Sequence, residues 1–195
     1  PHVDHHTHPD KEIGYKKSKG VKPLLQFILR RLILNSLRLY KIDINYIKYL
    51  YSFDNRVQYN PNREDEYSAK RPYLGVVLKI DKYDYFVPLE HPRQSHQTMK
   101  NNIFIFKIHN GKYGILGFNN MIPVKSEQLI DFDINKENVR YKQILISQYH
   151  FCNKHSQEIK EKANETYFRS LKNRFMKKIC CDFKLLEKKC EEYKN

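Results

Sequence analysis

The stretch "YLGVVLKIDKYDYFVPL" (residues 73–89) holds two runs of aliphatic, aromatic and β-branched residues, separated only by Asp81 and Lys82. Runs of this composition favour β-strands, and a two-residue connection is typical of an antiparallel hairpin. We therefore expect strands at 73–80 and 83–89, and we take this hairpin as the centre of the fold.

Further strands are expected downstream of the hairpin. "IFIFKI" (residues 103–108) and "YGILGF" (residues 113–118) flank "HNGK", whose Asn-Gly pair is the strongest short signal for a hairpin. "NMIPV" (residues 120–124) is a fifth, shorter apolar segment, and its proline favours the edge of a sheet.

Helical patterns lie on both sides of these strands. "DINYIKYLYSF" (residues 43–53) reads as an amphipathic helix with Asp43 as its N-cap, and a polar, exposed loop follows it. Beyond Asp131 the apolar residues recur at helical spacing, and Asp182 is placed to cap a last helix. The expected inward positions of these C-terminal helices are Ile144, Leu145, Gln148, Cys152, Ile159, Ala163 and Tyr167. The sequence thus predicts an α+β domain with a small antiparallel sheet.

The composition points to a polyanionic partner. The chain has 36 Lys and Arg against 22 Asp and Glu, a net charge of +14, and 15 tyrosines that suit stacking on unpaired bases. An idle basic surface is the alternative. The four cysteines show no metal-type spacing and read as reduced thiols of a cytoplasmic protein without cofactor. The apolar segment "PLLQFILRRLIL" is too short to span a bilayer.

The N-terminal residues differ from the rest. "PHVDHHTHPD" carries four of the nine histidines, a density typical of a metal site but also of a disordered or artificial tract. "RRLILNSL" (residues 30–37) is compatible with an encoded ribosome-binding sequence followed by a start at Leu37. We expect residues 1–36 to be a non-native or disordered extension and residues 37–195 to form a single domain. Without the seven basic and three acidic residues of 1–36, the net charge is still +10.

Several of these segments together resemble a known family. "YIKYLYSFDNRV", "LGVVLKI…YFVPLEHPRQSH", "GILGFNNMIPV" and "CDFKLLEKKC" are similar in order and spacing to the ToxN/AbiQ toxins of type III toxin–antitoxin systems, over about residues 38–195. The resemblance implies a metal-independent endoribonuclease with a twisted antiparallel sheet related to the barrel of MazF/Kid toxins. It also implies a repeat-encoded RNA pseudoknot antitoxin, cut by the toxin from its precursor and held in a closed protein–RNA ring, and a role in abortive infection by phage.

The resemblance places a candidate site after the second strand. The family's Leu-Thr-Ser-Pro-Lys, followed three residues later by His, corresponds to Leu89, Glu90, His91, Pro92, Arg93 and then His96. The family's tyrosine falls on Tyr67 and its lysine on Arg71, with Lys70 adjacent. The positive charges are kept, whereas Glu90 and His91 replace two hydroxyl side chains.

This replacement is compatible with catalysis. RNA cleavage without a metal needs a base for the 2′-OH, an acid for the leaving 5′-oxygen, and cations for the phosphorane. Histidine titrates near neutrality and serves as base or acid. We expect His91 as the base, His96 as the acid or an orienting group, and Arg71 and Arg93 as the phosphate clamp. Tyr67 and Lys70 are expected to bind RNA.

Other interpretations stay open for each residue and for the protein. His91 before Pro92 also fits a turn, His96 a cap for the next segment, and Glu90 a partner for His91 or for an arginine. A toxin that has lost catalysis fits the change at the family's serine position, and a non-catalytic RNA-binding module explains the charge and the tyrosines but not the His/Arg cluster. A DNA-binding regulator is disfavoured because the sequence has no helix-turn-helix signature.

Overall fold

A computed structural model describes residues 36–63 and 69–194, where seven strands form one sheet. The sheet order is β4-β5-β3-β2-β1-β7, with β6 also pairing with β3, and all pairs are antiparallel. The strands are β1 (Arg38–Ile42), β2 (Tyr73–Ile80), β3 (Tyr83–Glu90), β4 (Ile105–Lys107), β5 (Ile115–Gly117), β6 (Ile122–Pro123) and β7 (Leu129–Asp131).

The predicted hairpin is confirmed as the centre of the sheet. Ile80 pairs with Tyr83 across the two-residue turn, where Asp81 has a φ of 50°, a conformation that Asp tolerates. On its other edge, β3 pairs first with β6 through Tyr85 and then with β5 through Leu89. This one strand therefore connects both parts of the sheet.

The expected resemblance to a closed barrel is corrected by the sheet topology. In the described residues the sheet is twisted but open, because its outer strands β4 and β7 do not pair with each other. A barrel closes only when its two edge strands exchange hydrogen bonds along their length. β4 and β7 have three residues each, which leaves little backbone for such pairing.

Other strand boundaries differ from the prediction for local reasons. The segments at 103–108 and 113–118 keep only β4 and β5 as strands, because a wide turn replaces the expected tight hairpin. In that turn His109 and Asn110 both have positive φ, and Ile108 donates its N–H to Gly114. β1 and β7 lack a clear alternation of buried and exposed residues, and both were missed.

The helices are α2 (Ile44–Phe53), α4 (Gln94–Thr98), α5 (Val139–Lys154), α6 (Ser156–Lys172), α7 (Arg174–Ile179) and α8 (Phe183–Glu192), with short 3₁₀ turns η1 (Phe118–Asn120), η2 (Ser126–Gln128) and η3 (Ile134–Lys136). Four of the helices, α2, α5, α6 and α8, follow the predicted patterns, whereas the short helices α4 and α7 were not predicted. The side chains of Asp43 and Asp182 accept backbone hydrogen bonds at the starts of α2 and α8, as expected of N-caps. Of the predicted inward positions, Leu145, Gln148, Cys152, Ile159, Ala163 and Tyr167 are buried, and Ile144 is half-buried.

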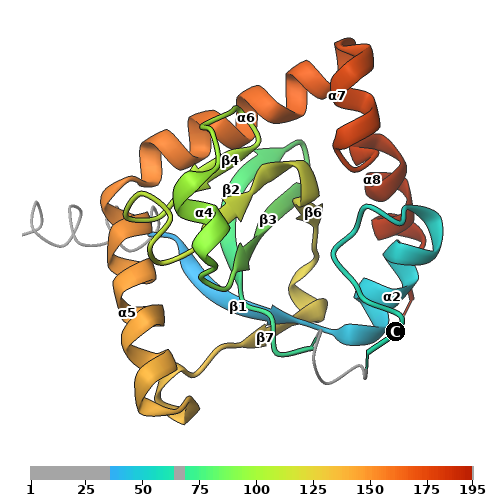
Figure 1. Cartoon of the computed structure of the whole chain (residues 1–195). Coiled ribbons are helices and arrows are strands. Elements are labelled where there is room, and N and C mark those ends of the chain that lie inside the picture. Colours follow the sequence, from blue (N-terminus) through green and yellow to red (C-terminus); the bar gives the residue numbers. More distant parts are fainter. Residues whose placement is uncertain (1–35, 64–68, 195) are drawn as a thin grey trace, which may run out of the picture. The chain divides into compact units, whose positions relative to one another are not determined.

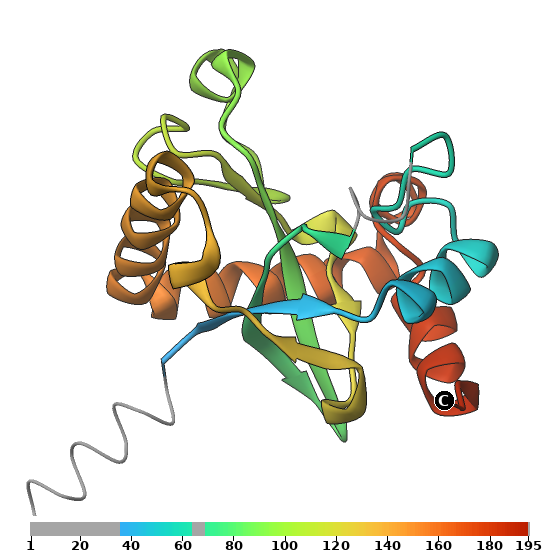
Figure 2. The same ribbon diagram turned by 90° about the horizontal axis from the view of Figure 1, so that it is seen from below.

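The helices surround the sheet on several sides. In Figure 1, α5 lies on one side of the sheet and α2 and α8 lie on the other. Figure 2 shows α6 running along the sheet between them, where it packs against β2. Among the described residues, no helix is both long enough and apolar enough to cross a bilayer. All four cysteines are buried free thiols.

Candidate active site

The register of the central hairpin brings the two halves of the predicted site together. Tyr73 at the start of β2 pairs with Pro88 near the end of β3, and Leu89 donates its N–H to the carbonyl of Pro72 at 3.0 Å. Because the strands are antiparallel, the residues before β2 lie beside the residues after β3. Arg71 is thus placed next to Glu90 and His91, although they are about twenty positions apart in the sequence.

These residues line a cavity of about 740 Å³. Four of its lining side chains are cationic, one is an imidazole, and one is a carboxylate. The lining residues are Gln58, Tyr59, Asn60, Arg63, Lys70, Arg71, Pro72, Leu89, Glu90, His91, Arg93 and Tyr141. A cavity with this excess of positive charge suits a phosphate backbone, and its aromatic rings suit unpaired bases.

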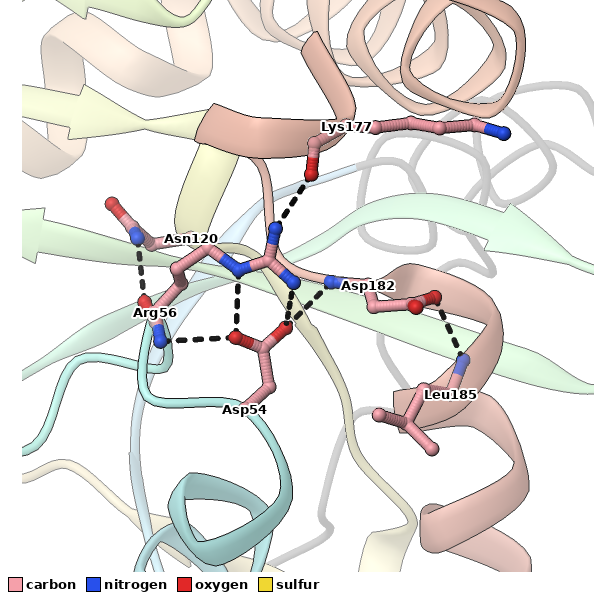
Figure 3. A network of polar contacts seen from close by, with 6 residues as sticks. All are labelled: Asp54, Arg56, Asn120, Lys177, Asp182 and Leu185. Carbon is pink, nitrogen blue, oxygen red and sulfur yellow. Dashed lines mark hydrogen bonds and ion pairs between the residues drawn. The ribbon is translucent and has the colours of Figure 1, made fainter. Parts of the chain in front are cut away.

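One wall of the cavity is the loop after α2, which a buried carboxylate holds in place (Figure 3). Asp54 accepts hydrogen bonds from Nε and Nη2 of Arg56 at 2.7 and 2.9 Å, and from the N–H of Asp182 at 2.6 Å. Arg56 also donates to the carbonyl of Lys177 at 2.6 Å. The loop is therefore attached to the C-terminal helices.

The hydrogen bonds of this network stabilise the ionised form of Asp54. Burial alone would raise the pKa of Asp54, but the hydrogen bonds from Arg56 and from the N–H of Asp182 outweigh burial and hold this pKa below its ordinary value. Asn120 of η1 donates from Nδ2 to the carbonyl of Arg56 at 2.7 Å. The same side chain accepts from Gln58 at 3.3 Å, which links the network to the cavity.

Two glycines in the β4–β5 turn allow it to approach the backbones of Glu90 and His96. Gly111 has a φ of +87°, and a Cβ there would collide with the backbone carbonyl of His96. Gly114 has a φ of +94°, and a Cβ there would collide with the carbonyl of Glu90. Only glycine allows this backbone to approach so closely in such a conformation. The turn thereby packs directly against the segment that carries the predicted site.

Glu90, at the cavity surface, forms a pair with His96 behind it. The carboxylate of Glu90 lies 3.7 Å from Nε2 of His96, whose residue is only 2% exposed and does not line the cavity. Burial lowers the pKa of His96, nearby Glu90 opposes this shift, and Arg93 adds to it. Within the part of the chain that the structure describes, the side chain of Glu90 therefore contacts His96 and Gln58 rather than His91 or an arginine.

His91 is exposed and has different surroundings. Its ring lies 5.4 Å from the ring of Tyr141, in the first turn of α5, at an interplanar angle of 49°. Burial, followed by the charge of Glu137, raises the pKa of Tyr141 to about 12, so its hydroxyl stays protonated. Arg93 is the N-cap residue of α4, makes no side-chain capping bond, and is exposed at the cavity.

The structure thus brings together five of the predicted site residues at the cavity: Lys70, Arg71, Glu90, His91 and Arg93. His96 is adjacent but buried, and it lies inside α4 rather than capping it. Tyr67 falls outside the described residues, as does the histidine-rich N-terminal tract.

The prediction missed further lining residues. Gln58, Tyr59, Asn60 and Arg63 belong to the segment expected to be only an exposed polar loop, yet the first three are half-buried. Tyr141 was read only as part of a helical region. A loop that mixes aromatic, amide and arginine side chains is the signal that points to RNA contact here.

Comparison with known proteins identifies the family. The family described as "Toxin ToxN, type III toxin-antitoxin system" matches residues 38–191. The chain belongs to the ToxN toxin family. Among its relatives are Endoribonuclease ToxN of Bacillus thuringiensis subsp. kurstaki, 32% identical over 80% of this chain and 84% of the relative, and Endoribonuclease AbiQ of Lactococcus lactis subsp. lactis, 28% identical over 86% and 94%.

Solved structures of related toxins share the fold of this ToxN-family protein. One, described for selective toxin inhibition by a non-coding RNA pseudoknot, has a TM-score of 0.68 and 31% identity over 81% of this chain and 98% of that chain. AbiQ, a lactococcal anti-phage endoribonuclease of a type III system, has a TM-score of 0.67 and 30% identity over 81% and 98%. The family assignment from sequence is therefore confirmed.

Proposed function

We propose that this ToxN-family toxin is a metal-independent, sequence-specific endoribonuclease, inhibited by a repeat-encoded RNA pseudoknot that it processes. We propose further that it acts on cellular or phage mRNA in abortive infection. The observation that carries the proposal is the cavity at the end of the central hairpin, where one exposed imidazole lies among four cations. The named activities of its relatives support the same reaction class.

In the proposed reaction one histidine acts as the base and two arginines bind the phosphate. His91 takes the proton of the 2′-OH, and the 2′-oxygen forms a bond to phosphorus while the bond to the 5′-oxygen breaks. Arg71 and Arg93 stabilise the charge on the phosphorane, so the cavity supplies positive charge without a metal ion. The products carry 2′,3′-cyclic phosphate and 5′-OH ends.

The leaving 5′-oxygen needs a proton, and the Glu90–His96 pair is the proposed donor. Glu90 lines the cavity, and Nε2 of His96 lies behind it, 3.7 Å from the Glu90 carboxylate. Burial of His96 favours the orienting role that the sequence left open over direct contact with substrate. Lys70 and Tyr67 are proposed to bind flanking RNA.

The decisive variant is His91→Ala, with His150→Ala as the matched control because His150 is an exposed histidine on α5 outside the cavity. Losing a positioned base costs about 10²- to 10⁴-fold in rate, so His91→Ala should abolish RNA cleavage and growth arrest while RNA binding persists. Cleavage rates should show a bell-shaped pH profile and no inhibition by EDTA.

Two outcomes would contradict this assignment. A wild-type protein that binds RNA but cleaves none at any pH would be a catalytically degenerate toxin, or a non-catalytic RNA-binding module. Metal-dependent cleavage that survives His91→Ala would point to a different nuclease mechanism.

A further inference from the structure

Gln58 connects two groups of the proposed site through a single side-chain amide. Its Oε1 accepts from Nη1 of Arg71, and its Nε2 donates to Oε1 of Glu90 at 3.2 Å. Its backbone carbonyl also accepts from Nη1 of Arg71, at 3.2 Å. A guanidinium only donates and a carboxylate only accepts, so a neutral group that does both is required to bridge them.

The surroundings of Arg71 differ from those of Arg56 in a way that suggests different tasks. Arg56 donates two hydrogen bonds to the carboxylate of Asp54, which neutralises its charge. Arg71 is instead held by two neutral oxygens of Gln58, and among the described residues no carboxylate forms an ion pair with it. Because neutral acceptors do not compensate the charge of a guanidinium, its full positive charge remains available to a phosphate.

The amide of Gln58 is itself anchored by a further hydrogen bond. Gln58 is half-buried, and its Nε2 also donates to Oδ1 of Asn120 at 3.3 Å. Asn120 in turn donates to the carbonyl of Arg56 at 2.7 Å. The position of the amide is therefore set by the buried network around Asp54 and not by the RNA.

If the proposed function is taken as given, we infer that Gln58 is a positioning residue. It fixes the guanidinium of Arg71 without compensating its charge, which stays available to the phosphate, and it aligns Glu90 with His96. It acts through these side chains and not on the substrate. This role requires a neutral side chain at position 58. A residue that only filled space would not have this requirement.

The test is Gln58→Glu, a substitution that keeps the shape and changes the charge. The introduced carboxylate neutralises Arg71 and repels Glu90, so kcat/KM for RNA cleavage at pH 8 should fall about 10- to 100-fold with an unchanged melting temperature. The other charged or titratable groups that line the same cavity are Tyr59, Arg63, Lys70, His91, Arg93 and Tyr141. Protonation restores a neutral acceptor, so the ratio of variant to wild-type activity should rise as the pH falls.

Two further variants separate positioning from general effects. Asn55→Asp adds the same charge to the same loop at an exposed residue that does not line the cavity, and it should change cleavage by less than about twofold. Gln58→Leu removes both bridges without adding charge, and its activity ratio to wild type should be low at every pH. If Gln58→Glu were as active as the wild type, or if Asn55→Asp lost as much activity, the inference would be wrong.

A binding measurement distinguishes failure of this inference from failure of the proposed reaction. With an RNA carrying a 2′-deoxy substitution at the cut site, Gln58→Glu should bind about tenfold more weakly and with a smaller salt dependence. If the wild type cleaves no RNA, the proposed function fails, but this comparison still decides whether Gln58 keeps Arg71 available. Equal affinity of variant and wild type would overturn the inference in either case.

Discussion

At the scale of residues, two histidines five positions apart have opposite environments. His91 is exposed at the cavity, whereas His96 is buried behind Glu90. Three backbone positions decide this difference: β3 ends at Glu90, α4 begins after Arg93, and Gly111 lets the neighbouring turn press on His96. The spacing in sequence indicates both as candidates, and only the fold assigns one to the surface and the other to the interior.

The buried histidine predicts a pH dependence of stability. The folded pKa of His96 lies below its ordinary value near 6.5, so the unfolded chain binds a proton there more readily. The free energy of unfolding should therefore decrease as the pH falls below about 6.5. Urea unfolding at pH 7 and pH 5.5 should show a smaller difference for His96→Asn than for the wild type.

The same measurement separates this effect from that of Asp54. The pKa of Asp54 is also lowered, but a carboxyl of this kind affects stability only at pH values below about 4. If His96→Asn and wild type lost equal stability between pH 7 and pH 5.5, the histidine would not be the source.

At the scale of elements, the sequence predicts those features that depend on residues close together in the chain, such as helix caps and tight turns. The caps of α2 and α8 depend on hydrogen bonds within three residues, and the β2–β3 hairpin depends on a two-residue turn. These features were predicted correctly. The wall that carries Gln58 was not, because its position depends on Asp54 accepting from the N–H of Asp182, 128 residues away. No local sequence pattern encodes such a contact. The position of the loop that carries Gln58 therefore follows only from the packing of the folded chain.

The contact between Asp54 and the C-terminal helices predicts a large loss of stability on mutation. Asp54→Ala leaves Arg56 and the N–H of Asp182 without their acceptor, and breaking such a buried pair should cost about 2–4 kcal/mol. Glu165→Ala is the control, because its exposed pair with Arg169 on α6 should contribute only about 0.3–0.5 kcal/mol. Both values can be measured by urea unfolding, and similar losses for the two variants would show that the Asp54 network is not a major anchor.

At the scale of the whole molecule, the net charge of +14 is distributed along the chain, and four cations gather at the cavity. Affinity for single-stranded RNA should fall with salt, with a log–log slope of about 0.7 for each phosphate contacted. Arg71→Ala and Arg93→Ala should each reduce the slope by about that amount, and lysine should restore affinity only in part if the guanidinium binds two oxygens.

The control for this measurement is Arg174→Ala, because Arg174 is exposed on α7 and does not line the cavity. An unchanged slope for both cavity variants would place the phosphate-binding cations elsewhere. That residues 37–195 suffice for function stays a prediction. The family match from residue 38 is compatible with it, and so is the burial of Leu37.

The long-range attachment of the loop after α2 has a consequence for synthesis of the toxin. Translation proceeds from the N-terminus, so the segment with Gln58, Arg71 and His91 emerges well before Asp182, which follows Asp54 by 128 residues. Until then the N–H of Asp182 that fixes Asp54 does not exist, and the loop lacks its attachment to the C-terminal helices. Nuclease activity should accordingly develop only after Asp182 has left the ribosome, so the mRNA being translated is not exposed to an active toxin while the preceding segments are synthesised.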